Sequence, residues 1–123
     1  MDKNTLEYKI AIVYIYATSA DAGDITEKEM NQLISDLASV FKTLNINIDA
    51  DNYLSDCFED FNNMDETETT EVVTSSIISL GELLSIDNLK IVYNGIADVV
   101  NADSLASEEK EVLKTLEKTW GLE

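Results

Sequence analysis

The sequence predicts an all-α protein, a single compact domain over residues 1–123 with roughly six or seven helices. The chain contains no proline and only four glycines, whereas all-β domains need many tight turns. Apolar residues recur at helical spacing through most of the chain. A short acidic stretch also occurs twice, at Ala20–Glu29 and Ala102–Glu111. Each copy follows an apolar run and precedes an amphipathic one, which predicts an internal pseudo-repeat of helix, acidic turn and helix.

The first predicted helix, Leu6–Ala20, contains the densest apolar run of the chain, Ile10–Tyr16. Its β-branched and aromatic residues would suit a strand. However, about 15 residues pass without a turn signal, which favours a helix. We therefore expect a helix that is mostly buried.

The second predicted helix is the clearest amphipathic one. Thr26 suits the N-cap position and Glu29 the third helical position, the pattern of a capping box. The apolar residues that follow at helical spacing are Met30, Leu33, Ile34, Leu37, Phe41 and Leu44. We expect this helix to end near Asn45.

A short third helix is expected to begin near Asp49, and a polar connection is expected at Asn62–Glu68. The apolar positions of the third helix are Leu54, Cys57, Phe58 and Phe61, and those of the fourth are Val73, Ile77, Leu80 and Leu84. Small residues within the fourth helix, Ser75, Ser76, Ser79 and Gly81, predict close packing against a neighbour.

The fifth predicted helix begins near Asp87, and its apolar face includes Leu89, Val92, Ile96 and Val99. Ser107 is the expected cap of a last helix, which carries Val112, Leu113, Leu116 and Trp120. Gly121 is placed to end that helix.

The composition excludes several classes of function. Acidic residues number 25 against 8 basic ones, for a net charge of −17, and all the basic residues are lysine. Nucleic acid is not an expected ligand, because it requires basic side chains. A basic protein partner or a cation suits this field better. With no histidine and one cysteine, neither a histidine-activated nucleophile nor a zinc site of the usual ligands can form. No catalytic residue is predicted, and we expect no enzyme.

The lone cysteine, the N-terminal sequence and the lack of a long apolar stretch predict a soluble protein of the cytoplasm. Cys57 lies among apolar residues, which is typical of a buried structural thiol. The N-terminus lacks the apolar core of a signal peptide. No apolar stretch reaches about 18 residues, so no membrane span is expected.

The two acidic turns are the candidate binding site. Clustered carboxylates repel one another, and a hard divalent cation such as Ca²⁺ or Mg²⁺ relieves that repulsion through oxygen ligands. The candidate metal ligands are Asp21, Asp24, Glu29, Asp103, Glu108 and Glu109, with Asp98 also nearby. This site requires the two turns to lie at the same end of the domain.

Helix capping is the alternative explanation of these residues. Acidic side chains at helix N-termini stabilise the helix dipole and bind exposed N–H groups without any metal. Capping accounts well for Glu27, Glu29, Glu108 and Glu109, and less well for Asp21 and Asp103.

The segment 49–60 begins like an EF-hand loop, but Leu54 stands where the turn glycine is required.

Two stretches resemble the tellurite-resistance TerB family. They are ADAGDITEKE at Ala20–Glu29 and IADVVNADSLASEEKEVLKTL at Ile96–Leu116. The resemblance implies a compact helical domain with a pseudo-repeat, an acidic cluster that binds a divalent metal, and a role in stress or toxic-anion resistance. Ala22, Ser104 and Lys110 depart from the family pattern.

The resemblance also implies which residues carry the metal: Asp21 with Glu29, and Asp103 with Glu108 or Glu109. The leading hypothesis is thus a TerB-like acidic adaptor that binds a divalent cation weakly and docks protein partners. The alternative is an acidic protein-interaction module that mimics the charge of nucleic acid and has no metal site. A metal hydrolase is a third class, for which no specific residue pattern speaks.

Overall fold

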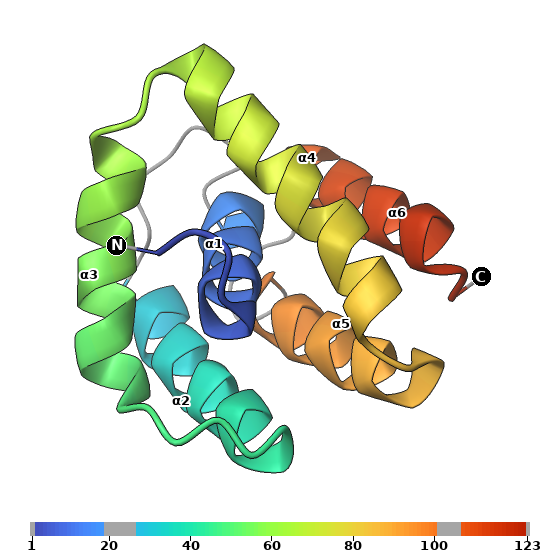
Figure 1. Ribbon diagram of the computed structural model, residues 1–123, viewed down its shortest axis with the longest axis horizontal. Coiled ribbons are helices and arrows are strands. Elements are labelled where there is room, and N and C mark those ends of the chain that lie inside the picture. The colour runs from blue at the N-terminus through green and yellow to red at the C-terminus, as the bar shows by residue number, and fades with distance from the viewer. Residues whose placement is uncertain (1, 19–26, 101–106, 123) are drawn as a thin grey trace.

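The computed structural model describes residues 2–18, 27–100 and 107–122, and over these ranges it contains six helices and no strand (Figure 1). The helices are α1 (Leu6–Thr18), α2 (Glu27–Thr43), α3 (Ala50–Asn62), α4 (Glu66–Leu83), α5 (Ile86–Val100) and α6 (Ser107–Trp120). The prediction of an all-α bundle is confirmed. None of the described helices combines the length and the apolar character needed to cross a lipid bilayer.

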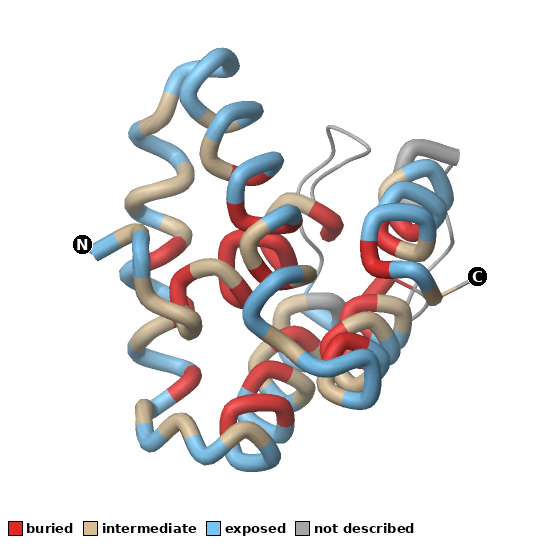
Figure 2. Tube along the Cα trace, turned by 45° about the vertical axis from the view of Figure 1, so that its right-hand side comes forward, coloured by how far each residue is buried: buried red, intermediate tan, exposed pale blue. Residues whose placement is uncertain are grey.

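Helix α1 lies in the centre of the bundle, and the other five helices surround it (Figure 1). Between Tyr8 and Thr18 only Lys9 and Tyr16 are not fully buried. In Figure 2, red segments are concentrated in the interior of the bundle. A helix that is apolar on all sides has no solvent face and is stable only when it is enclosed. The predicted buried helix is therefore confirmed, and enclosure by five neighbours outweighs the strand preference of its residues.

Two helices end with the same backbone motif. Beyond α2, Asn45 has a φ of 61° and the Ile46 N–H donates to the Phe41 carbonyl over 2.8 Å. Beyond α6, Gly121 has a φ of 68° and the Leu122 N–H donates to the Glu117 carbonyl over 2.9 Å. These bonds occupy carbonyls that have no partner inside the helix. The predicted ends near Asn45 and Gly121 are confirmed.

Helix α4 begins earlier than the apolar pattern predicts. The expected polar connection at 62–68 is reduced to Asn63–Asp65, because the Asp65 carboxylate accepts the Glu68 N–H over 2.7 Å and caps the helix. Glu66 and Glu68 in the first turn then favour the helix dipole. At the other end, Leu84 was expected to lie in the helix. It is instead the C-cap residue and has an extended backbone conformation.

The small residues of α4 do permit close packing. A Cβ atom on Gly81 would lie 3.2 Å from Cδ1 of Trp120, and the Trp120 indole N–H donates to the Ile77 carbonyl over 2.9 Å. Ser76 is also buried, whereas Ser75 is exposed. The predicted close packing is confirmed: the neighbour at Gly81 is α6, and the Ser79 hydroxyl accepts from the Lys9 ammonium of α1 over 2.8 Å.

Helices α2 and α5 pack antiparallel. The position of a Cβ on Gly95 lies 3.4 Å from Cγ2 of Val40, and the carboxylates of Asp36 and Asp98 interact electrostatically. Asp36 precedes Val40 in α2, while Asp98 follows Gly95 in α5. The beginning of α2 and the end of α5 therefore lie at the same end of the bundle.

Candidate functional site

The metal ligands predicted at the acidic turns lie at or beyond the limits of the structure. Asp21, Asp24 and Asp103 fall outside the described residues. Glu29 lies in the first turns of α2, and Glu108 and Glu109 lie in the first turn of α6, but their side chains are not described. Whether these side chains meet around a cation thus stays a prediction.

Within the described ranges, no group of three or more acidic or cysteine side chains is arranged to hold a metal ion. The segment 49–60, which begins like an EF-hand loop, is helical instead. Asp49 is the N-cap of α3, and its carboxylate accepts the Asp51 N–H over 3.2 Å. Leu54 is buried in the core where the loop would need a glycine.

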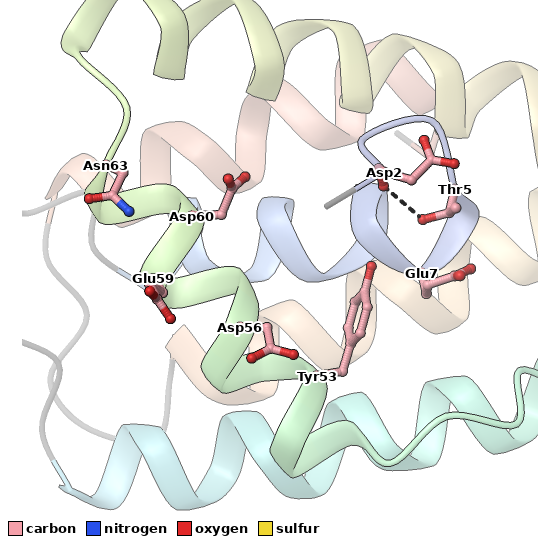
Figure 3. Close-up of a pocket in the computed structure, with 8 residues that line it drawn as sticks. All are labelled: Asp2, Thr5, Glu7, Tyr53, Asp56, Glu59, Asp60 and Asn63. Carbon is pink, nitrogen blue, oxygen red and sulfur yellow. Dashed lines mark hydrogen bonds between the residues drawn. The ribbon is translucent and has the colours of Figure 1, made fainter.

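The most acidic described cavity is an open groove between the N-terminal segment and α3, with a volume of about 490 Å³ (Figure 3). Its eight lining residues comprise five carboxylates and three neutral polar side chains. The carboxylates are Asp2, Glu7, Asp56, Glu59 and Asp60, and the neutral residues are Thr5, Tyr53 and Asn63. No lysine is among these eight, so the groove concentrates negative charge. We call it the acidic groove.

The N-terminal wall of the acidic groove is held in place by local hydrogen bonds. The Asp2 carboxylate accepts the Asn4 N–H over 2.9 Å, and the Thr5 hydroxyl donates to the Asp2 carbonyl over 3.3 Å. The same Thr5 hydroxyl accepts the Tyr8 N–H over 3.3 Å and so caps α1. These bonds direct the segment along α3.

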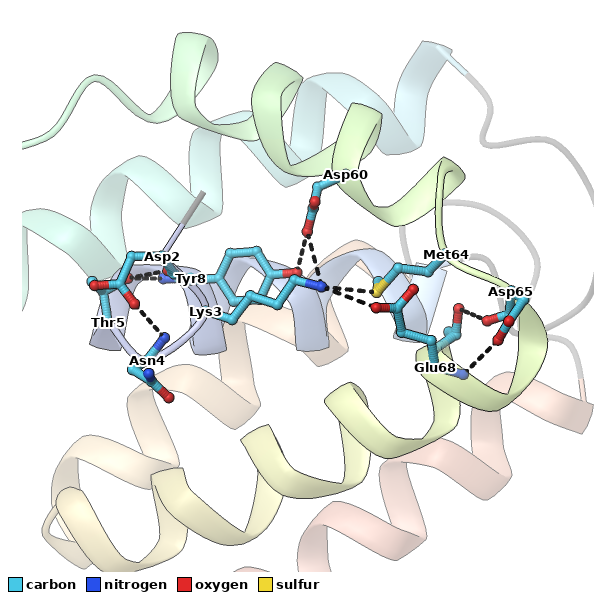
Figure 4. A network of polar contacts seen from close by, with 10 residues as sticks. Asp2, Lys3, Asn4, Thr5, Tyr8, Asp60, Met64, Asp65 and Glu68 are labelled. Atoms are coloured by element: carbon cyan, nitrogen blue, oxygen red, sulfur yellow. Dashed lines mark hydrogen bonds and ion pairs between the residues drawn. The ribbon is translucent and has the colours of Figure 1, made fainter.

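A lysine of the chain itself lies at the edge of this groove (Figure 4). The Lys3 ammonium nitrogen is 3.9 Å from Oδ2 of Asp60 and 3.5 Å from Oε2 of Glu68, and it donates to the Met64 sulfur over 3.7 Å. Tyr8 donates its hydroxyl to the same Asp60 oxygen over 2.6 Å. The Lys3 side chain is about a third exposed, so each ion pair contributes little to stability. The arrangement nevertheless shows how this surface receives an ammonium group.

Burial governs the titration of Tyr53, which lines the groove, and of Cys57 on the same helix. It raises the pKa of the Tyr53 hydroxyl and that of the Cys57 thiol, each to about 12. Cys57 is fully buried in α3, as the sequence predicts. A thiol in this environment stays protonated at neutral pH and is a poor nucleophile.

The acidic groove is not apparent from the sequence, although part of its signal is present there. Tyr53, Asp56, Asp60 and Asn63 recur at intervals of three or four residues and so lie on one face of α3. From Asp49 to Asp87 there are also eleven acidic residues and no lysine. The contribution of residues 2–7 could not be predicted, because only tertiary packing brings that segment to α3.

Comparison with models of known protein families, with curated proteins and with solved structures finds no match to this chain. The described part of the chain forms a helical bundle around one buried helix, with an acidic groove on its surface.

Proposed function

We propose that this protein is an acidic interaction domain that binds a basic segment of a partner protein in the acidic groove. The observation that carries the proposal is the groove itself, in which five carboxylates and no lysine line one cavity. Lys3 supports it, because its ammonium group already lies between Asp60 and Glu68 at the rim.

Electrostatics favours this partner on two scales. A net charge of −17 attracts basic proteins over long range and speeds their association. At short range, the Tyr53 ring offers a flat surface beside the carboxylates, which suits the stem and charge of a lysine or arginine side chain. In the charge-mimic form of this hypothesis, the partner is a nucleic-acid-binding protein whose basic surface the domain occupies.

The test is binding of a fluorescent, lysine-rich peptide, followed by anisotropy at physiological ionic strength. Asp56→Asn/Glu59→Gln removes two exposed charges from the groove, and Glu82→Gln/Glu111→Gln removes two exposed charges elsewhere. The groove variant should bind about tenfold more weakly, and the control within about twofold of the original protein. Equal weakening in both variants would mean that only the overall charge attracts the peptide.

A second candidate function is TerB-like binding of a divalent cation at the acidic turns. It is supported by the antiparallel packing of α2 and α5, because the beginning of α2 and the end of α5 share one end of the bundle. The proposed pseudo-repeat requires that proximity. Asp21, Asp24 and Asp103 would supply carboxylates there, together with Glu29, Glu108 and Glu109. A role in tellurite or stress resistance belongs to this candidate through the resemblance alone, whereas the cytoplasmic location is proposed from the lone cysteine and the N-terminal sequence.

Thermal melting separates this candidate from simple screening. A cation bound only by the folded state stabilises it as RT ln(1 + [L]/Kd), whereas NaCl at matched ionic strength only screens repulsion. CaCl₂ or MgCl₂ should raise the melting temperature beyond NaCl, and Asp21→Asn/Asp103→Asn should reduce that excess. Coincident curves for the divalent and monovalent salts would reject the site.

A further inference from the structure

The hydroxyl of Tyr14 is a buried polar group without a hydrogen-bond partner among the described residues. Tyr14 lies on the central helix α1 and its side chain is fully buried. A hydroxyl that loses its hydrogen bonds to water on burial and gains none in the protein costs about 1–3 kcal/mol of folding free energy. Such groups are rare in folded proteins. Its position therefore calls for a ligand or another compensating interaction.

The hydroxyl is directed at the interface between α2 and α5. A Cβ atom on Gly95 would lie 1.9 Å from the Tyr14 oxygen and 3.1 Å from Cζ, so only glycine leaves space for it. The same position on α5 lies 3.4 Å from Cγ2 of Val40 on α2. Tyr14 thus places an oxygen between the two helices.

Two carboxylates on the same two helices interact electrostatically with this hydroxyl. Asp36 lies one turn before Val40 on α2, and Asp98 lies three residues after Gly95 on α5. Burial is the largest cause that raises the pKa of Tyr14, and both carboxylates raise it further. Burial also raises the pKa of Asp36, and the Asp98 carboxylate adds to that increase. The Gln32 amide donates to Oδ2 of Asp36 over 3.0 Å. Neither carboxylate forms an ion pair with a lysine within the described residues.

We infer that the Tyr14 hydroxyl oxygen and the carboxylates of Asp36 and Asp98 form a cation site between α2 and α5, with Ca²⁺ as the class of ligand. These three groups offer hard oxygen atoms, which Ca²⁺ prefers in an irregular geometry completed by water. A cation there relieves the repulsion between the two carboxylates and gives the phenol oxygen an electrostatic partner. Asp98 is exposed, so the ion has a path from solvent.

This site is separate from both proposed functions. None of its three residues lines the acidic groove, and none belongs to the six ligands proposed at the acidic turns. Asp98 lies near the end of α5, close in sequence to the second acidic turn, so the variants at Asp21 and Asp103 are needed to distinguish the two cation sites.

The test is calorimetric titration with Ca²⁺ alone. The original protein should show a saturable event that loses at least about tenfold in affinity in Asp36→Asn/Asp98→Asn. Asp21→Asn/Asp103→Asn and the charge-matched Glu82→Gln/Glu111→Gln should keep the event within about twofold. The inference is wrong if Ca²⁺ binds with no saturable event, or if the Asp36 and Asp98 variant binds as tightly as the controls.

A spectroscopic measurement tests the role of Tyr14 without relying on the carboxylate variants. A cation at the phenol oxygen perturbs tyrosine ultraviolet absorbance, so Ca²⁺ should produce a difference spectrum that saturates together with the calorimetric event. Tyr14→Phe should abolish that spectrum, whereas Tyr93→Phe, which removes the hydroxyl that donates to Glu117, should preserve it. A spectrum that survives Tyr14→Phe would remove the phenol oxygen from the site.

Discussion

Tyr8 and Tyr14 lie on the same central helix, and both are fully buried, yet their hydroxyl groups differ in hydrogen bonding. The Tyr8 hydroxyl donates to the Asp60 carboxylate of α3 over 2.6 Å. The Tyr14 hydroxyl lies against Gly95 and has no hydrogen-bond partner among the described residues. Burial raises the pKa of both groups, and neighbouring carboxylates raise it further in each case.

The difference separates a structural contact from a candidate binding group. Near the beginning of α1, the phenol and the carboxylate satisfy each other, and Lys3 adds a positive charge. Toward the end of α1, a phenol and two carboxylates come together without a cation from the described part of the chain. The first arrangement is complete, whereas the second is completed by an ion from solution.

The largest expected effect comes from filling the space that the Tyr14 hydroxyl occupies. Gly95→Ala would place a Cβ 1.9 Å from that oxygen, and we expect a loss of about 2–3 kcal/mol in the free energy of unfolding. Glycine to alanine inside a helix otherwise gains up to about 1 kcal/mol, so the sign is diagnostic. In a double-mutant cycle with Tyr14→Phe, measured by urea denaturation, the loss should shrink by about 1 kcal/mol. If the two substitutions have additive effects, the new Cβ does not overlap with the Tyr14 hydroxyl in the variant, and the helices have moved instead.

The next effect is the loss of the contact between Tyr8 and Asp60. Tyr8→Phe removes a hydrogen bond to a charged acceptor and should cost about 1.5–3 kcal/mol in urea denaturation. Asp60→Asn is the matched variant, because its amide oxygen still accepts the phenol hydrogen. If Tyr8→Phe costs no more than Tyr14→Phe, the contrast between the two tyrosines is false.

A smaller effect of opposite sign is expected at Asp36. Burial and the Asp98 carboxylate raise its pKa in the folded protein above the unfolded value near 3.8. The stability linked to this group is therefore present below that pH and is lost as the pH rises through the folded pKa. Without divalent cations, Asp36→Asn should gain on the order of 0.5–1 kcal/mol at neutral pH and show no gain near pH 3.

The matched control for Asp36 is Glu82→Gln, which removes one exposed charge far from Tyr14. Melting curves across pH should show a difference between the two variants that grows from acidic to neutral pH. A difference that stays constant with pH would contradict the coupling between Asp36 and its neighbours.

The smallest effect is expected for Tyr14→Phe without added cation. The substitution removes the cost of an unpartnered buried hydroxyl but leaves a small void. These opposing effects should keep the stability within about 0.5 kcal/mol of the original or raise it slightly. Urea denaturation in the presence of a chelator measures it. A loss comparable to that of Tyr8→Phe would reveal a hydrogen bond that the protein itself supplies.

Much of the fold could be predicted because local signals and packing agree. The run Ile10–Tyr16 is apolar in every direction, which indicates an enclosed helix, and α1 is enclosed. Asn45 and Gly121 lie just beyond the helix ends, where a residue in the left-handed backbone conformation commonly ends a helix. Both residues adopt that conformation. The early start of α4 was missed because apolar periodicity ignores the Asp65 cap.

The candidate sites were less predictable for a physical reason. The acidic groove combines residues 2–7 with one face of α3, and no pattern along the chain joins them. The direction of Tyr14 is equally hidden, because a helix that is apolar on all sides does not indicate which neighbour each residue meets. A glycine within α5 indicates that another group lies close to the helix at Gly95, but it does not indicate that this group is a hydroxyl.

The most direct test of the proposed site between α2 and α5 is a crystal of the protein soaked in MnCl₂ and measured for anomalous scattering. Mn²⁺ takes the same hard oxygen ligands as Ca²⁺ and its position is visible without any substitution. We predict an anomalous peak between α2 and α5, at bonding distance from the Asp36 and Asp98 carboxylates and beside the Tyr14 oxygen. Peaks only at exposed carboxylates elsewhere, with none at this pair, would contradict the account.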